Sequence, residues 1–138
     1  MALIKLLFAG ALLFSFNAGA EWVYIQNSEV GQFYYDPSSI VQKGGYIEVL
    51  TLFDIKGPHT VLGRNVGSLV GADIYDCKKR RAKSLKIADY SEQQGKGEVI
   101  DSFVIKRPKW QPTLNGTNSG ALYEILCMPA QGVLSNLT

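Results

Sequence analysis

The sequence predicts an α+β fold, in which an antiparallel β-sheet meander of about six strands precedes a short C-terminal helix tethered by a disulfide. Three observations predict this class. Segments of alternating apolar and polar residues recur along the chain, glycine and proline separate them, and a helical spacing of apolar residues precedes the second cysteine. With 138 residues, 46% apolar and 19% charged, the chain has enough apolar material for one core.

The first residues, 1–20, have the composition of a secretory signal peptide. Lys5 is their only charge, residues 6–16 form an uncharged run of about eleven, and Ala20 ends a group of small residues. The alternative is a retained membrane anchor, but roughly 20 apolar residues are needed to span a bilayer. We expect cleavage after Ala20, no transmembrane segment, and no lipid anchor, because no cysteine lies near the cleavage point. Residues 21–138 then form a single exported domain, either periplasmic or secreted to the cell surface.

Alternation of β-branched and aromatic residues with polar ones predicts the strands. The longest candidate is 46–55, whose odd-numbered residues form the better core face. An Asp-Pro-Ser-Ser turn is expected at 36–39, and Gly44-Gly45 is expected to close a hairpin. The remaining strand candidates are 22–25, 33–35, 69–77, 84–88 and 98–105.

The predicted helix follows a run of turn-forming residues at 115–120. Asn118 or Ser119 is expected to cap it, and it carries Cys127 and ends at Pro129. Its apolar side is expected to comprise Leu122, Ile125 and Leu126.

The two cysteines, Cys77 and Cys127, both lie in the predicted exported part of the chain. An oxidising compartment makes pairing the default, so we expect a structural disulfide that pins the helix to the sheet. A metal or redox site is the rival interpretation. With His59 as the only histidine and no Cys-x-x-Cys pair, the sequence offers neither zinc-ligand nor redox spacing.

Enzymatic chemistry is not predicted. His59 lies in a Gly-Pro loop rather than beside a nucleophile, the Gly-x-Ser-x-Gly motif is missing, and the acidic residues form no pair placed for acid–base work. We therefore expect no catalytic residues, no cofactor and no metal site.

A basic segment follows Cys77 and is the strongest charge anomaly of the chain. The overall formal charge of +2 is too small for the whole surface to bind polyanions, and nucleic acid is not an expected partner. A local site for an anionic glycan, an anionic lipid or an acidic protein segment is one interpretation; a solvated strand edge that discourages aggregation is the other. The basic segment comprises Lys78, Lys79, Arg80, Arg81, Lys83 and Lys86.

Several features, taken in order, resemble the surface-adhesin protein E family of exported bacterial proteins. They are Tyr34-Tyr35-Asp36-Pro37-Ser38-Ser39-Ile40, Phe53-Asp54, Tyr75-Asp76-Cys77 with the basic residues after it, Gly95, Gly97, Trp110, and the stretch from Leu122 to Cys127. The resemblance implies an antiparallel sheet with a C-terminal helix held by the cysteine pair. It also implies adhesion, since the family includes a surface lipoprotein that binds host extracellular-matrix and serum proteins and can form homodimers. Here Glu21 and Trp22 stand where that lipoprotein carries its anchoring cysteine.

The function predicted from these observations is that of an exported, non-enzymatic binding protein of adhesin type, which recognises host proteins or polyanions. The alternatives are a periplasmic structural or envelope-assembly factor and a secreted enzyme inhibitor.

Overall fold

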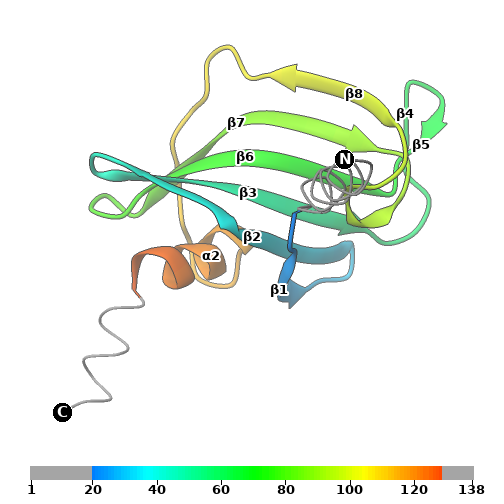
Figure 1. Ribbon diagram of the computed structural model, residues 1–138. Helices are drawn as coiled ribbons and strands as arrows, with labels where there is room; N and C mark the ends of the chain where they lie inside the picture. Colours follow the sequence, from blue (N-terminus) through cyan, green and yellow to red (C-terminus); the bar gives the residue numbers. More distant parts are fainter. Residues whose placement is uncertain (1–19, 129–138) are drawn as a thin grey trace, which may run out of the picture.

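The computed structural model describes residues 20–128, which form a main β-sheet with an α-helix packed on it (Figure 1). The predicted signal peptide, apart from Ala20, and Pro129 lie outside the described residues. The elements are β1 (Val23–Asn27), β2 (Gly31–Lys43), β3 (Tyr46–Ile55), β4 (Thr60–Val61), β5 (Arg64–Asn65), β6 (Ser68–Asp76), β7 (Arg81–Tyr90), the 3-10 helix η1 (Gln93–Gly95), β8 (Val99–Val104), β9 (Gln111–Pro112) and α2 (Asn118–Cys127).

The main sheet is an antiparallel meander of seven strands in the order β1-β2-β3-β6-β7-β8, with β9 pairing the free end of β7. Strand β3 lies at the centre and pairs β6 along nearly its whole length, from Tyr46 opposite Asp76 to Asp54 opposite Ser68. The small β4–β5 hairpin forms within the connection between β3 and β6. Neither helix found between residues 20 and 128 has the length and the apolar composition that a membrane span requires.

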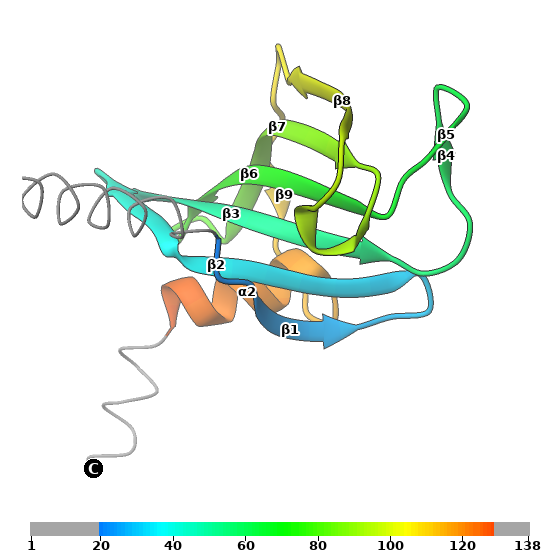
Figure 2. The same cartoon turned by 45° about the vertical axis from the view of Figure 1, so that its right-hand side comes forward.

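Helix α2 covers one face of the sheet, here called the helix face (Figure 2). Odd-numbered residues of β3 point to it, as their alternation predicts. The buried core at this face consists of Phe33, Ile47, Val49, Tyr75, Ala82, Leu122 and Tyr123. The opposite face, here called the open face, carries the even-numbered residues of β3. Near the end of that strand η1 covers it, and the Leu52 side chain is fully buried there.

The disulfide between Cys77 and Cys127 joins the end of β6 to the last residue of α2, with a Cα–Cα distance of 5.4 Å. This confirms the predicted bridge between helix and sheet. Beside it, the Tyr123 hydroxyl donates a hydrogen bond of 2.7 Å to the Cys77 carbonyl oxygen. A ten-residue helix is too short to persist alone in water, so these contacts and core packing determine its order.

The helix start and its buried side differ from the prediction. Thr117, rather than Asn118 or Ser119, is the N-cap, and its hydroxyl accepts a hydrogen bond from the Gly120 amide. Tyr123 joins Leu122 in the core, whereas Ile125, expected on the buried side, is exposed. The reason is the disulfide and the tyrosine hydrogen bond at Cys77, which turn the Tyr123 side of the helix toward the sheet.

The turn predicted at 36–39 is wrong, because β2 continues through it as a bulged strand. Four residues, 37–40, lie opposite the single residue Val49. Asp36 is buried and accepts hydrogen bonds from the Ser38 amide and hydroxyl, while the Ser39 hydroxyl accepts one from the Leu50 amide on β3. The local bonds that favour a turn thus form within a bulge.

Candidate polyanion-binding face

The six cations of the basic segment fall into two groups. Lys78, Lys79 and Arg80 form the exposed turn between β6 and β7, directly after the disulfide. The other three, Arg81, Lys83 and Lys86, lie on β7 itself.

A bulge in β7 brings its three cations to one face of the sheet. Lys83 pairs with Ile74 and Lys86 with Ala72, and the register shifts by one residue between these two pairs. Ile74 and Ala72 alternate normally along β6, so both cations lie on the same side. That side is the open face, because Ala82, which precedes Lys83, packs in the core beneath α2. Strict alternation would have placed Lys83 and Lys86 on opposite faces.

Trp110 forms an aromatic platform for two of these cations. The Arg81 guanidinium carbon lies 4.3 Å and the Lys83 ammonium 4.2 Å from the centre of the indole ring, and Tyr46 packs against the same ring at a centroid distance of 5.6 Å. The short pairing of β9 with β7 sets this position. Such cation–π contacts fix the direction of long side chains and lower the entropy lost when they bind a partner. In the sequence, Trp110 stands out only as a feature shared with the adhesin family, because it lies 24 or more residues from the cations of the basic segment.

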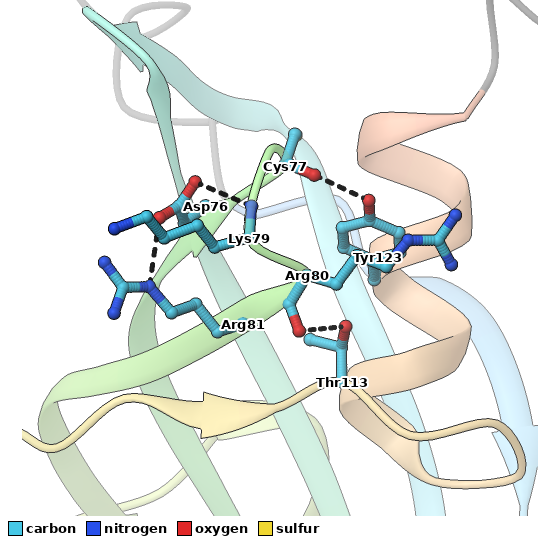
Figure 3. A network of polar contacts seen from close by, with 7 residues as sticks. All are labelled: Asp76, Cys77, Lys79, Arg80, Arg81, Thr113 and Tyr123. Carbon is cyan, nitrogen blue, oxygen red and sulfur yellow. Dashed lines mark hydrogen bonds and ion pairs between the residues drawn. The ribbon is translucent and has the colours of Figure 1, made fainter.

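Asp76 partly neutralises the cluster (Figure 3). Its carboxylate accepts a hydrogen bond of 3.0 Å from the Arg81 guanidinium and one of 3.3 Å from the Lys79 backbone amide. Burial would raise the pKa of Asp76, but Arg81 and Lys79 outweigh it, and the pKa is lowered. Of the six cations, Arg81 is therefore committed to an internal ion pair. Among the described residues, the other five make no ion pair.

The turn that carries Lys78, Lys79 and Arg80 is braced from several sides (Figure 3). Arg80 adopts a left-handed φ of 49°, and its carbonyl accepts hydrogen bonds from both the amide and the hydroxyl of Thr113. Its guanidinium lies 5.7 Å from the ring centre of Tyr123 on α2. The three exposed cations thus project from a fixed backbone next to the disulfide.

On the helix face, a separate cavity of about 350 Å³ lies beside Asp73 and Tyr75, and Lys109 and Ser119 also line it. The Thr51 hydroxyl donates a 3.3 Å hydrogen bond to the Asp73 carboxylate. Burial raises the pKa of Asp73, although hydrogen bonds from Ser84 and Thr51 act in the opposite direction. Burial, assisted by the charge of Asp73, also raises the pKa of Tyr75.

The substitution Asp73→Asn is expected to stabilise the protein at neutral pH. A raised carboxyl pKa means that the folded state binds the proton more tightly than the unfolded state. The contribution of Asp73 to the free energy of unfolding is therefore fully present below the ordinary carboxyl pKa, and it is lost as the pH rises through the pKa of Asp73 in the folded state. Removal of the charge should therefore raise the free energy of unfolding at pH 7 by about 1 kcal/mol, a common size for one substitution. Urea unfolding at pH 7 and pH 3 measures it.

The gain from Asp73→Asn should vanish at pH 3, where both proteins carry a neutral side chain at this position. Glu124→Gln, at an exposed acid on α2, is the control and should change stability little at either pH. A gain of the same size at both pH values would contradict the proposed desolvation of Asp73.

His59 is exposed in the segment before β4. Among the described residues, no nucleophilic side chain is hydrogen-bonded to it. The charge of His59 acts on Asp89, whose pKa is raised by burial and by Asp101 and lowered in part by His59. Within residues 20–128, no three His, Cys, Asp or Glu side chains converge on a point where a metal ion could bind.

The fold and this face define a class of protein: a small, disulfide-braced sheet domain that presents a rigid cationic and aromatic surface. The model of the family "Surface-adhesin protein E" matches residues 22–128, and the chain belongs to this family. This confirms the resemblance drawn from the sequence, and it supports the broad assignment as a surface adhesin.

Solved structures of Haemophilus influenzae protein E share the fold. One is 17% identical, with a TM-score of 0.60, over 75% of this chain and 83% of that chain. A second, from a non-typeable strain, is 15% identical, with a TM-score of 0.59, over 83% of this chain and 82% of that chain. No curated protein sequence matches the chain.

Proposed function

We propose that the protein is an exported, non-enzymatic adhesin whose basic segment binds a polyanionic, heparin-like glycan of the host surface. The observation that carries the proposal is the alignment of Lys83 and Arg81 on the Trp110 ring, next to the exposed turn cations Lys78 and Lys79. Family membership supports the adhesin role. Acidic segments of matrix or serum proteins offer the same charge and are the competing ligands.

Charge and rigidity both favour a polyanion. A single exposed ion pair contributes only about 0.2–1 kcal/mol, so a useful affinity needs several cations acting together. The braced turn and the indole platform hold these cations in place before binding, which lowers the ordering cost. Among the described residues, Lys78, Lys79 and Lys83 form no salt bridge, so no such bridge has to break, although the charge of Lys79 acts on Asp76.

Reversal of two of these charges, Lys79→Glu with Lys83→Glu, is expected to weaken heparin binding about tenfold at low salt, the effect of losing about 1.4 kcal/mol. It should also flatten the dependence of affinity on salt, because fewer charge contacts remain to be screened. Affinity chromatography on heparin at two ionic strengths measures both effects. Arg81 is left unchanged, because its reversal would place two carboxylates together at Asp76.

The matched control is Lys56→Glu with Lys96→Glu, which changes the net charge equally at exposed sites outside the basic segment. It should retain nearly native heparin binding. If both double variants lose retention to the same extent, the effect is one of net charge and the basic segment is not the site.

Location can be tested separately. We propose that the protein acts at the cell surface after removal of residues 1–20, so protease added to intact cells should digest it. Protection from protease on intact cells, with digestion after the outer membrane is opened, would place it in the periplasm and favour an envelope role.

A further inference from the structure

The open face carries a groove of about 520 Å³ beside the basic segment. Its floor is formed by β3, β6 and β7, and β8 forms one wall. By register, one end lies at the pair Lys86 and Val104, and the other at the pair Tyr90 and Val99. Four residue steps along β7 separate these ends, which corresponds to about 13 Å.

The groove exists because small side chains occupy its floor. Ala72 and Ala88 lie at central positions of β6 and β7. Val70 on β6 pairs with Ala88 on one side and with β3 on the other. Large side chains normally fill such positions on a sheet face, and here they are absent from the middle of the floor. The ends of the wall are apolar, since Val99 and Val104 on β8 are 50% and 72% exposed, and Ser102 lies between them opposite Ala88. An apolar concavity of this volume, left open to solvent, is typical of a ligand site.

One charged side chain, Lys86, lines the groove and lies at its open end. It is exposed and makes no ion pair within the described part of the chain. The other end is blocked, because η1 lies against β3 and β6 there and is held by hydrogen bonds from Gln94 to Asp54 and from the Gly95 amide to Ser68. The groove therefore offers a cation at its mouth and an apolar channel behind it.

We infer that this groove binds a single-chain anionic amphiphile of the fatty-acid class. The carboxylate would pair with Lys86, and the acyl chain would lie over Ala72 and Ala88 against Val99 and Val104. The charge of Lys86 selects an anionic head, and the length of the groove suits a medium-length chain. A free fatty acid and a lysophospholipid share this chemistry, and the experiment distinguishes them. The inference does not depend on glycan binding, since it uses only Lys86 of the basic segment.

Titration of the isotope-labelled mature chain with sodium dodecanoate, below its micellar concentration, tests the inference by methyl NMR. Shifts are expected at the methyl groups of Val70, Ala72, Ala88 and Val104, and not on α2. Dodecyltrimethylammonium, which has the same chain and the opposite charge, should bind at least tenfold more weakly. Equal binding of the two amphiphiles, or shifts confined to other parts of the protein, would overturn the inference.

Three variants, together with Lys78→Glu as a control, locate the bound head group and the acyl chain. Lys86→Glu should weaken dodecanoate binding about tenfold, whereas Lys78→Glu, the same change in the turn, should leave it unchanged. Ala88→Leu fills the floor and should abolish binding while heparin retention persists. Should that variant fail to fold, Val104→Asp at the exposed rim should also weaken binding. Native affinity in the Lys86→Glu and Val104→Asp variants would refute the site.

A parallel titration with monomeric lysophosphatidylglycerol shows which class of molecule supplies the acyl chain. Stronger binding of dodecanoate indicates a free fatty acid, and stronger binding of the lysolipid indicates a membrane-derived ligand. Both results support the site, provided that the same groove methyl groups shift. Absence of binding by both amphiphiles overturns it, whatever the outcome with heparin.

Discussion

Replacement of both cysteines, Cys77→Ser with Cys127→Ser, is expected to lower the free energy of unfolding by about 4 kcal/mol, because the bridge closes a long loop. The two residues are 50 apart in sequence, so the unfolded chain gains much conformational freedom when the link is removed. Since native domains are stable by only about 5–15 kcal/mol, this change should bring the protein close to its unfolding threshold. Urea denaturation of the oxidised and substituted proteins measures it.

The loss should begin at the C-terminal helix. Without the bridge, α2 keeps the Thr117 cap, the Tyr123 hydrogen bond to Cys77, and the packing of Leu122, but it loses its only covalent link to β6. Hydrogen exchange should therefore show that α2 amides lose protection while β3 and β6, paired along their lengths, keep theirs.

Reduction of the unmodified protein is the control for side-chain effects of serine and should reproduce the same pattern of exchange. Equal protection of α2 in the bridged and unbridged proteins would mean that packing alone orders the helix.

The bounds and the core-facing side of the central strand could be predicted from the sequence, because both depend on residues within or next to the strand. Residues 46–55 alternate over their whole length and are bounded by Gly44-Gly45 and by the Gly57-Pro58 break, and β3 has these bounds. The burial of Leu52 on the opposite face was not predictable in this way. It depends on η1, which lies about forty residues later in the chain and folds back over the open face.

The sequence predicted which cations form the candidate face, but not how they are arranged on it. Clustered cations marked the segment, but Lys83 and Lys86 are an odd number of residues apart, so alternation alone separates them. The bulge that unites them arises from how β7 pairs with β6, and local residue preferences carry little information about such pairing. Trp110 reaches the cations through the edge pairing of β9, a contact between distant segments. The groove has the same origin, since Ala72 and Ala88 make a hollow only when their strands pair in this register.

Leu122→Ala is expected to cost about 3 kcal/mol in the free energy of unfolding, the usual effect of removing a buried leucine side chain from a packed core. Leu122 is 0% exposed and lies with Val49, Tyr75 and Phe33 in the cluster between α2 and the sheet. The disulfide holds the end of the helix close to β6, so the neighbouring groups cannot move in freely to fill the space. The cavity cost should therefore add to the loss of apolar burial.

Ile125→Ala on the same helix is the matched control. This substitution removes a similar side-chain volume, but Ile125 is 37% exposed. Its cost should be about 0.5 kcal/mol, as for other surface substitutions. Urea denaturation with the disulfide intact compares the two variants, and an unchanged slope would show that helix and sheet still unfold together. A large cost for Ile125→Ala, close to that for Leu122→Ala, would mean that α2 presents its predicted side, which includes both residues, rather than the Tyr123 side, to the sheet. The hydrogen bond from the Tyr123 hydroxyl to the Cys77 carbonyl argues against that outcome, since it can form only in the observed rotation of the helix.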